Sequence, residues 1–510
     1  MININRNPEM ARKNFYDVII IGGGIHGIML ALIASQRKLK TLLLERDDFG
    51  SATSFNSLRI IHGGFRYLQK MDLHRFFESV ADRKWFLQNF PDLVEPIPCL
   101  IPLSGKGIYR PFIFKAALLL NDVLSYRRNK GINKDSKLPR GKVISANEVK
   151  KVFNDLKYLK LKGGAVWYDG SMPDSQKVMI ETLKWACSLG TIALNYFDVK
   201  ELIKKNNIVE GVRAYDKEVK KFYDFNSKIV INAAGPWSRK IAASFDKDYE
   251  KLFKSSIAWN ILFNKKAISD YAIAVTPQRP HAKTYFLRPL NGMLFAGTVH
   301  EPYKDVEKDP IPSEDSVTYF IQDLNSLINN LNLKKEDILH IFSGHMPVKK
   351  EGTNDLSDRE IIIDHSKKNG PKGLFSISGV KFTTARLIAE KTINLIFKNS
   401  DKQVSNDKRN LNYSSKIDIN LNSNGLDESA KEILRKIIQS ESVLHIDDLL
   451  LRRISLGDNP VKALELAPQI SSLFGWDKDH FELEINRLKD YIYQKNYNVH
   501  PIDKIVLKSN

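Results

Sequence analysis

The sequence predicts an α/β protein in three parts: a domain built on a parallel sheet, an antiparallel β-rich lobe and an all-helical C-terminal domain. Residues 17–45 indicate a buried strand, a glycine turn, a helix and a second buried strand, which together form a βαβ unit. Strand-like runs dominate residues 251–342, and the chain beyond residue 424 reads as helices. A chain of 510 residues is also too long for one simple core, so two or three lobes are expected.

The middle of the chain alternates helices and strands. Helices are predicted over 148–156 and 175–190, the second ending at Gly190 as a helix C-cap would. Strands predicted at 208–216 and 220–235 are expected to lead back to the parallel sheet.

The β-rich lobe and the segments after it follow in order. SIAWNILF, KTYFLRP and MLFAGTV are strand-like runs, and a helix is predicted near 314–331. Residues 373–397 indicate a strand, a tight glycine turn and a long helix. The polar stretch at about 400–424 has the composition of a linker, so the helices beyond it are expected to form their own domain.

Composition narrows the class of protein. Hydrophobic residues make up 43% and charged residues 27%, which is ordinary for a folded soluble or peripheral protein. The two cysteines, Cys99 and Cys187, lie far apart, so a reducing compartment, no disulfide framework and no metal site are expected. The first residues lack the features of a secretory signal, and no run approaches the roughly 18 apolar residues of a membrane span. We therefore expect a cytoplasmic protein.

The chain is strongly basic, with a net charge of +19. This charge favours anionic substrates or anionic lipid surfaces, although a lysine-rich proteome explains it equally well. No nucleic-acid-binding module is present, so no nucleic-acid partner is expected. The apolar stretch 111–120 and the basic residues at 126–142 predict peripheral contact with the inner face of the cell membrane, with an exposed solvated loop as the alternative.

The strongest local motif is the glycine turn of the βαβ unit. Gly22, Gly24 and Gly27 form a G-x-G-x-x-G that follows a strand and opens a helix, as in dinucleotide-binding folds. The helix N-terminus then offers free N–H groups to a pyrophosphate. Glu45 ends the second strand, where a carboxylate bonds ribose hydroxyls and repels the 2′-phosphate of NADP. The unit alone does not distinguish FAD from NAD.

Four further segments resemble the flavin-linked glycerol-3-phosphate dehydrogenases, in the same order along the chain. ERDDFGSATSFNSLRIIHGGFRYLQ at 45–69 is similar to the family's ATSxxSS and HGGLRYLE run. VINAAGPWSRK at 230–240 resembles its N-A-T/A-G-P-W turn, and SGVKFTTAR at 378–386 resembles its G-G-K-L-T-T-x-R turn. HIDDLLLRRISLG at 445–457 resembles its C-terminal D-x-L-x-R-R-T-x-L-G run. The resemblance spans roughly residues 15–490.

This resemblance implies FAD as cofactor and a Rossmann-like FAD-binding domain. It implies an oxidoreductase domain over 15–400, with FAD-binding parts at about 15–105, 160–250 and 343–400 and a substrate lobe at about 251–342. A linker at 401–424 and a helical C-terminal domain at 425–510 follow. The residues expected to bind FAD are Gly22, Gly24, Ile25, His26, Gly27, Glu45, Arg46, Thr53, Ser54, His62, Gly63, Gly235, Gly379, Val380, Lys381, Phe382 and Thr383.

The resemblance also implies residues for chemistry. Arg66, with Tyr67 beside it, and Lys381 correspond to the family's catalytic positions near the substrate. Arg66 would hold an oxygen or anion with its fork of donors, and Lys381 would orient the substrate oxygen. Lys381, at a helix start, would also stabilise charge on the reduced flavin.

The substrate lobe departs from the family at three positions. Met346 stands where the family has a phosphate-binding arginine, His300 stands for an aspartate, and Trp259 stands, by a less secure match, for a histidine. Such changes would make the pocket more apolar, unless other cations rebuild an anion site. Arg288 and His345 are the substrate-binding candidates for that role, together with His281 and Lys283 in the same lobe.

The sequence therefore predicts an FAD-dependent dehydrogenase that oxidises glycerol 3-phosphate or a related polyol phosphate, passing electrons to quinone or another acceptor. The alternative is an FAD oxidoreductase of the same superfamily that acts on a different hydroxy or amino compound, because Met346 offers no charge. A flavin-binding protein without turnover, attached to a membrane or partner through its basic face, is a third hypothesis. Reduction of the flavin by a candidate substrate distinguishes the enzyme from the third hypothesis.

Overall fold

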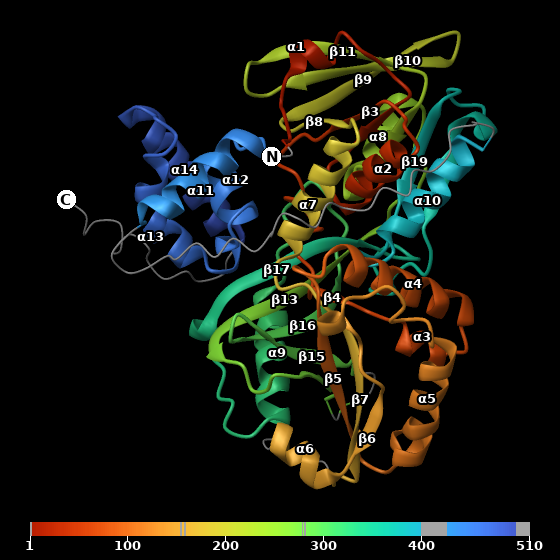
Figure 1. Ribbon diagram of the computed structural model, residues 1–510, viewed down its shortest axis with the longest axis vertical. Helices are drawn as coiled ribbons and strands as arrows, with labels where there is room; N and C mark the ends of the chain where they lie inside the picture. Colours follow the sequence, from red (N-terminus) through yellow and green to blue (C-terminus); the bar gives the residue numbers. More distant parts are fainter. Residues whose placement is uncertain are drawn as a thin grey trace.

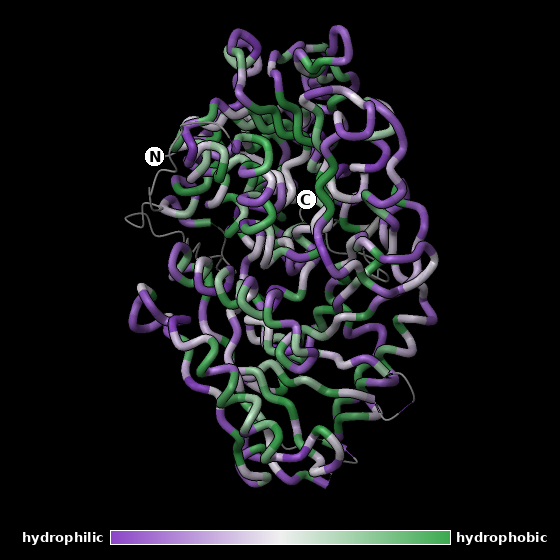
Figure 2. Tube along the Cα trace, turned by 90° about the vertical axis from the view of Figure 1, so that its right-hand side faces the viewer, coloured by the Kyte–Doolittle hydropathy of each residue, from purple (hydrophilic) through white to green (hydrophobic). Residues whose placement is uncertain are grey.

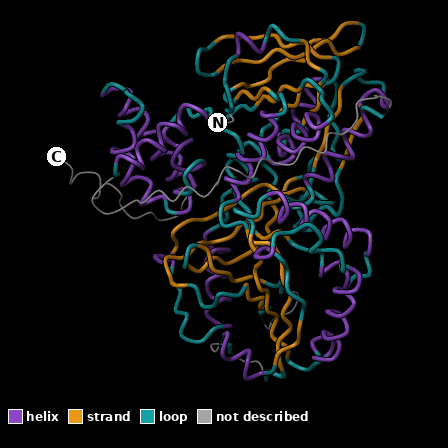
Figure 3. Tube along the Cα trace, viewed as in Figure 1, coloured by secondary structure: helices purple, strands orange, loops and turns teal. Residues whose placement is uncertain are grey.

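The computed structural model describes residues 3–153, 156–157, 160–277, 279, 282–398 and 426–495. His281 and the predicted linker at 401–424 lie outside these residues. The described chain forms three sheets and a separate group of C-terminal helices (Figure 1). Both lobes contain strands and helices, whereas the C-terminal group consists of helices alone (Figure 3). The predicted α/β fold class, with its β-rich lobe and helical C-terminal part, is confirmed.

A six-stranded, mostly parallel sheet forms the centre of the first lobe. Its order is β18-β19-β12-β2-β3-β8, and only β18 runs antiparallel, at one edge. Every residue of β2 and β3 is buried, which explains their continuous apolar runs. The strands are β2 (Val18–Ile21), β3 (Thr41–Leu44), β8 (Ile192–Leu194), β12 (Val230–Asn232), β18 (Ile361–Asp364) and β19 (Leu374–Ser378).

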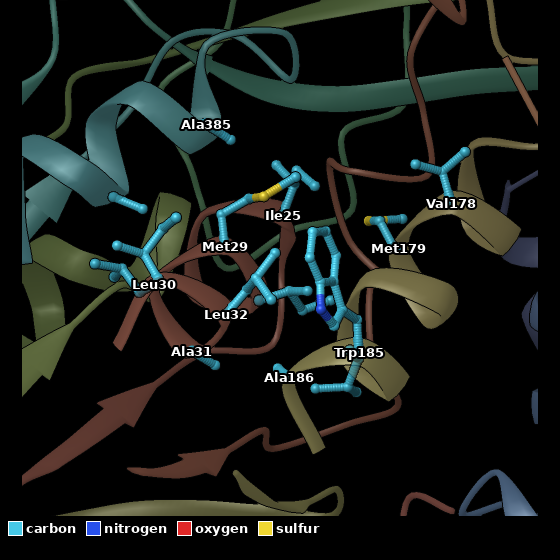
Figure 4. Packing of buried hydrophobic residues seen from close by; sticks show 14 of the residues in the cluster. Ile25, Met29, Leu30, Ala31, Leu32, Val178, Met179, Trp185, Ala186 and Ala385 are labelled. Atoms are coloured by element: carbon cyan, nitrogen blue, oxygen red, sulfur yellow. The ribbon is translucent and has the colours of Figure 1, made fainter. Parts of the chain in front are cut away.

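Helix α2 (Ile25–Gln36) lies inside this lobe and is apolar on nearly all sides. It packs between α7 (Ser175–Ser188) and α10 (Ala385–Ile396). Figure 4 shows Met29 and Leu32 of α2 between Trp185 of α7 and Ala385 of α10. This packing holds the N-terminus of α2 at the carboxyl end of β2.

A separate four-stranded sheet covers the top of the first lobe (Figure 1). It contains β1 (Phe15–Tyr16), β9 (Phe197–Lys205), β10 (Ile208–Asp216) and β11 (Lys221–Ser227). Of the strands expected to lead back to the parallel sheet, only β12 does so. Residues of β10 alternate between exposed and buried, which suits a sheet with one solvated face.

A nine-stranded sheet forms the second lobe. Its main order is β17-β13-β16-β15-β14-β5-β7-β4, with β6 paired to β7, and only β14 and β5 pair in parallel. The strands are β4 (Ile60–Ile61), β5 (Glu95–Leu103), β6 (Lys142–Ile144), β7 (Gly163–Ser171), β13 (Ser255–Lys266), β14 (Ala272–Val275), β15 (Tyr285–Leu290), β16 (Met293–Pro302) and β17 (Ile338–Pro347). The lobe therefore draws strands from well outside the 251–342 range expected for it.

Helices flank this second sheet, and both lobes have apolar interiors. The helices are α3 (Phe65–Gln69), α4 (Leu73–Asn89), α5 (Pro111–Leu124), α6 (Ala146–Val152) and α9 (Glu314–Leu327). Two short helices of the first lobe are α1 (Pro8–Ala11) and α8 (Ser238–Phe245). Figure 2 shows hydrophobic residues gathered along the inner strands and hydrophilic residues towards the periphery. None of the helices in the described ranges is both long and apolar enough to span a membrane.

The C-terminal helices have a hydrophobic core of their own, which includes Leu434, Ile446, Leu449 and Leu488. They are α11 (Glu428–Ser440), α12 (Ile446–Arg452), α13 (Pro460–Ser471) and α14 (Lys478–Lys495). This group packs beside the first lobe (Figure 1). The residues of the predicted C-terminal domain after 495 lie outside the described part of the chain.

Candidate active site

A cavity of about 590 Å³ lies between the two lobes. Ile21, Leu44 and Ala233 line it from the carboxyl ends of the parallel strands β2, β3 and β12. Ala258 and Thr298 line it from β13 and β16 of the nine-stranded sheet. Ligands of open α/β sheets bind at this carboxyl edge, so the cavity is the candidate active site.

The glycine turn forms one end of the cavity. Gly22 has a positive φ of +106°, and a methyl group on Gly27 would come within 1.8 Å of the Gly22 carbonyl oxygen. Gly27 is therefore required for close packing of helix and strand, whereas Gly24 faces the cavity. The Ile25 N–H, at the start of α2, donates to Ser54 Oγ at 3.0 Å.

Glu45 lies at the end of β3 and faces the same cavity. Its carboxylate accepts hydrogen bonds from the backbone N–H groups of Gly23 at 2.5 Å and Asp47 at 2.9 Å. Burial and the nearby charge of Asp47 raise the pKa of Glu45 to about 7. Next to it, the Arg46 guanidinium stacks on the Trp237 ring, 3.8 Å from the ring centroid.

A buried ion pair of Asp169 and Arg83 holds the His62–Gly63 turn in place. Asp169 accepts hydrogen bonds from the Gly63 N–H and from Arg83 Nη1, both at 2.7 Å, and its other oxygen lies 3.1 Å from His62 Nδ1. Burial opposes the charge on Asp169, but the contacts with His62 and Arg83 outweigh it and lower its pKa to about 2. His62 lines the cavity, while Gly63 packs against Arg83 and leaves no room for a side chain.

Most of the expected cofactor residues converge on the cavity. Those that line it are Gly22, Gly24, Ile25, His26, Glu45, Arg46, Thr53, Ser54, His62, Gly235, Gly379, Val380, Lys381, Phe382 and Thr383. Gly27 and Gly63 do not line the cavity, because Gly27 packs against the Gly22 carbonyl and Gly63 packs against Arg83.

Lys381 and His300 line the cavity, and the charges of Arg66 and Lys283 lie close to them. Lys381 lies over the Tyr67 ring, with Nζ 4.2 Å from the ring centroid. Burial and the charge of Arg66 lower the pKa of Lys381 to about 8. Burial, Lys283 and Arg66 together lower the pKa of His300 to about 4, and His300 Nδ1 is buried without a hydrogen-bond partner. Within the described residues, no carboxylate forms an ion pair with Arg66, Lys283 or Lys381.

Two of the expected substrate residues, Trp259 and Arg288, do not line the cavity. Trp259 is fully buried on the face of β13 opposite Ala258 and Asn260, and its indole N–H donates to Glu301 at 2.5 Å. Successive side chains of a strand point to opposite faces, so an alignment that is wrong by one residue selects a side chain on the wrong face.

Arg288 and His345 do not rebuild an anion site. The Arg288 guanidinium is buried and donates to the carbonyl oxygens of Leu58, Arg59 and Pro289. Burial and the charge of Arg59 lower its pKa to about 10. His345 borders the cavity, but its ring nitrogens contact Ser255 Oγ at 3.0 Å and the Lys308 carbonyl at 3.2 Å. Neither side chain takes the place of the missing arginine.

Met346 lines the cavity as expected. The structure adds two polar residues that the sequence argument missed, because they lie within apolar strands. Asn260 of β13 and Thr298 of β16 face the cavity, and the Thr298 hydroxyl donates to Asn260 Oδ1 at 2.7 Å. The available signal was Asn260, a polar residue within the otherwise apolar run 257–263 of β13.

The family of FAD-dependent oxidoreductases matches residues 17–395 of this chain. The chain belongs to this family. A glycerol-3-phosphate dehydrogenase of Synechocystis is 30% identical over 411 residues, covering 77% of this chain and 72% of that protein. The mitochondrial glycerol-3-phosphate dehydrogenase of Bos taurus is 32% identical over 421 residues, but the chain spans only 56% of its length.

Solved structures show the same fold. The glycerol-3-phosphate dehydrogenase of Bacillus halodurans, complexed with FAD, has a TM-score of 0.73 at 19% identity and covers 98% of this chain and 100% of its own. The L-α-glycerophosphate oxidase of Mycoplasma pneumoniae, with FAD bound, has a TM-score of 0.55 at 17% identity over 78% of this chain and 98% of its own.

The residues of the cavity fit FAD. Gly235 has a φ of +55°, and a methyl group there would meet nothing within 4 Å, so the backbone is open to a ligand. His26 Nε2, at the opening of α2, is buried without a hydrogen-bond partner. The free N–H groups of α2 suit the pyrophosphate and Glu45 suits the ribose. FAD is the cofactor of this oxidoreductase.

Proposed function

We propose that this protein oxidises the secondary hydroxyl of glycerol 3-phosphate or a related polyol phosphate. Lys381 and His300, which line the cavity, and the nearby charges of Arg66 and Lys283 carry the proposal. Besides burial, the charge of Arg66 lowers the pKa of Lys283, His300 and Lys381, and an anionic ligand would relieve this repulsion. Relatives that are glycerol-3-phosphate dehydrogenases support the same substrate class.

The chain's own residues have separate roles in this proposal. Arg66 and Lys283 bind the phosphate, and Lys381 orients the substrate hydroxyl near Tyr67. The unpartnered Nδ1 of His300, neutral at pH 7 because its pKa is about 4, accepts the hydroxyl proton. Bound FAD would accept the hydride from the carbon that carries this hydroxyl. The alcohol thus loses a hydride and a proton and becomes the ketone.

Anaerobic flavin bleaching tests the proposal. Glycerol 3-phosphate is added to the purified, FAD-loaded protein, and loss of the oxidised-flavin absorbance band is followed. Rapid bleaching by glycerol 3-phosphate, with much slower bleaching by glycerol, is the expected result. An intact band that dithionite still removes would contradict this substrate and leave the cofactor site sound.

A different hydroxy or amino substrate is the second candidate. Met346 supports it, because it lines the cavity where the resembled family has an arginine. Amino acids and hydroxy acids, added in the same assay, test this candidate. Bleaching by one of them at lower concentration than glycerol 3-phosphate would make it the substrate.

We also propose that α5 contacts an anionic membrane, where a quinone could accept the electrons. One face of α5 and its flanks exposes Phe112 (65%), Leu119 (67%), Val123 (59%) and Tyr126 (69%), which follow helical spacing. Exposed basic residues surround this face, including Lys106, Arg110, Lys115 and Arg127. An apolar face rimmed by basic residues is typical of helices that lie in a membrane interface.

Flotation with vesicles tests this contact. Wild-type protein should float with phosphatidylglycerol vesicles, and Leu119→Glu combined with Val123→Glu should abolish flotation. Tyr319→Glu, on the exposed face of α9, is the matched control and should float normally, since Tyr319 is exposed to the same extent (67%) in another part of the lobe. Equal flotation of all three proteins would contradict a role for α5. A quinone analogue that reoxidises the reduced protein only in the presence of vesicles would support the acceptor.

A further inference from the structure

The cavity-lining segment 48–59 is an irregular series of turns between β3 and β4. Ser51, Thr53 and Ser54 of this segment line the FAD cavity, and Ser54 accepts the first N–H of α2. The backbone hydrogen bonds within the segment close only single turns, such as those from Phe55 N–H to Ala52 and from Asn56 N–H to Thr53, so its position also depends on what it packs against.

The C-terminal helical region contacts this segment at its beginning. The Asp48 carboxylate accepts from Arg452 Nε at 2.6 Å and from Arg453 Nη1 and Nη2 at 2.8 and 2.9 Å. The side chains of Asp48 and Arg453 are fully buried. Burial opposes the charge on Asp48, but the two arginines hold its pKa well below its usual range.

The same region contacts the middle and the end of the segment. A methyl group on Gly457 would come within 3.0 Å of Phe55 Cζ, so the Phe55 ring lies directly against that turn. The buried Arg59 guanidinium donates to both carboxylate oxygens of Asp458, at 2.6 and 2.5 Å. Bidentate pairs of this kind define position and angle as well as energy.

We propose that the C-terminal helical region is a positioning element for the cofactor. It holds segment 48–59 at Asp48, Phe55 and Arg59, and the segment has its FAD-binding shape only while these contacts are made. Asp48, Phe55 and the C-terminal residues Arg453 and Asp458 do not line the cavity, so their contacts act on FAD through Ser51, Thr53 and Ser54, which do. The proposal rests on FAD as cofactor and is independent of the substrate.

The energetics of buried ion pairs favour this role over a purely stabilising one. A buried pair adds little net stability compared with an apolar contact of the same volume, but it specifies one geometry. Two such pairs flank a segment of twelve residues that surrounds the ligand. Loss of either pair leaves a buried charge without a partner, and the segment must move to hydrate it.

FAD titration of the apoprotein tests the proposal without any substrate. Asp458→Asn removes one contact and Phe55→Leu weakens a second. The matched control is Glu218→Gln, which weakens another docking contact of the same helices, that of His445 Nε2 with Glu218 at 3.1 Å, in which neither residue belongs to segment 48–59. Affinity is measured by quenching of flavin fluorescence, segment mobility by hydrogen exchange and folding by thermal unfolding.

We expect Asp458→Asn and Phe55→Leu to raise the Kd for FAD at least tenfold and to speed exchange in peptides that cover 48–59. Glu218→Gln should lower the unfolding temperature but leave the Kd and this exchange within twofold of wild type. If Asp458→Asn does not fold, Phe55→Leu alone decides. Unchanged affinity in the folded variants, or an equal loss of affinity in Glu218→Gln, would overturn the proposal.

Discussion

Lys381 has a lowered pKa because the cavity wall buries it and Arg66 repels its charge. Its pKa of about 8 lies within the range where enzymes are assayed. In the proposed function Lys381 orients the substrate hydroxyl, which it does as a protonated donor, so substrate binding weakens as pH rises through this pKa. The pH dependence of substrate binding therefore reports on Lys381.

We predict that the glycerol 3-phosphate concentration for half-maximal flavin reduction rises above pH 8, about tenfold per pH unit for a single group. Lys381→Arg should keep tighter binding to higher pH, because a guanidinium stays charged there. Anaerobic reduction, measured between pH 6.5 and 9.5, checks this. Identical pH profiles for the two proteins would show that another group titrates.

Gly24 and Gly27 belong to one motif but have different tasks. A methyl group on Gly27 would overlap the Gly22 carbonyl at 1.8 Å, whereas one on Gly24 would meet only Ser54 Oγ, at 3.3 Å. We predict that Gly27→Ala destabilises the apoprotein by ~3 kcal/mol or more, because backbone must move to admit it. Gly24→Ala should leave the apoprotein within about 1 kcal/mol of wild type and weaken FAD binding. Urea unfolding and FAD titration separate the two effects, and equal destabilisation by both substitutions would contradict them.

At the scale of elements, strand alternation decided which substrate-side predictions held. The strand-like run SIAWNILF located β13 correctly, but the less secure match selected Trp259, which lies on the face of β13 away from the cavity. Asn260, one residue later, faces the cavity. The residues of a glycine turn act through the backbone, so the question of which strand face a side chain occupies does not arise for them. For this reason more of the cofactor residues than of the substrate residues were predicted at the cavity.

The docking of α12 gives a prediction about pH and stability. His445 Nδ1 contacts Glu484 at 2.8 Å and Nε2 contacts Glu218 at 3.1 Å. Burial opposes the charge on His445, but the two glutamates outweigh it and raise its pKa to about 9. The pKa of His445 in the folded protein is above the unfolded value of 6.5. The stabilisation from its contacts with the two glutamates is therefore complete below pH 6.5 and is lost as pH rises through 9.

We therefore predict that His445→Gln lowers the free energy of unfolding by roughly 1–3 kcal/mol at pH 6 and by much less at pH 10. Thermal unfolding of both proteins across this range checks the prediction. A difference that stays constant with pH would mean that His445 contributes by packing, for example through its edge contact with the Tyr196 ring, whose centroid lies 4.8 Å away.

At the scale of the whole molecule, the net charge of +19 should raise the rate at which anionic substrates associate with the protein. We predict that kcat/KM for glycerol 3-phosphate falls several-fold when ionic strength rises from about 20 to 300 mM, because salt screens long-range attraction. A neutral osmolyte at equal osmolarity should leave kcat/KM unchanged. The same loss with the osmolyte would point to a solvent effect on the protein instead.

By itself, the sequence determined the parallel-sheet domain, the glycine turn, Glu45 and the ordered motifs that indicate FAD, because each depends on residues close together in the chain. Only the tertiary structure decided that the charges of Arg66 and Lys283 lie close to His300 and Lys381 of the cavity, while Arg288 donates to backbone carbonyls. It also joined Asp48 to Arg453 and Arg59 to Asp458 across about 400 positions. Such contacts arise from the packing of whole lobes, so the spacing of residues that are close together in the sequence does not predict them.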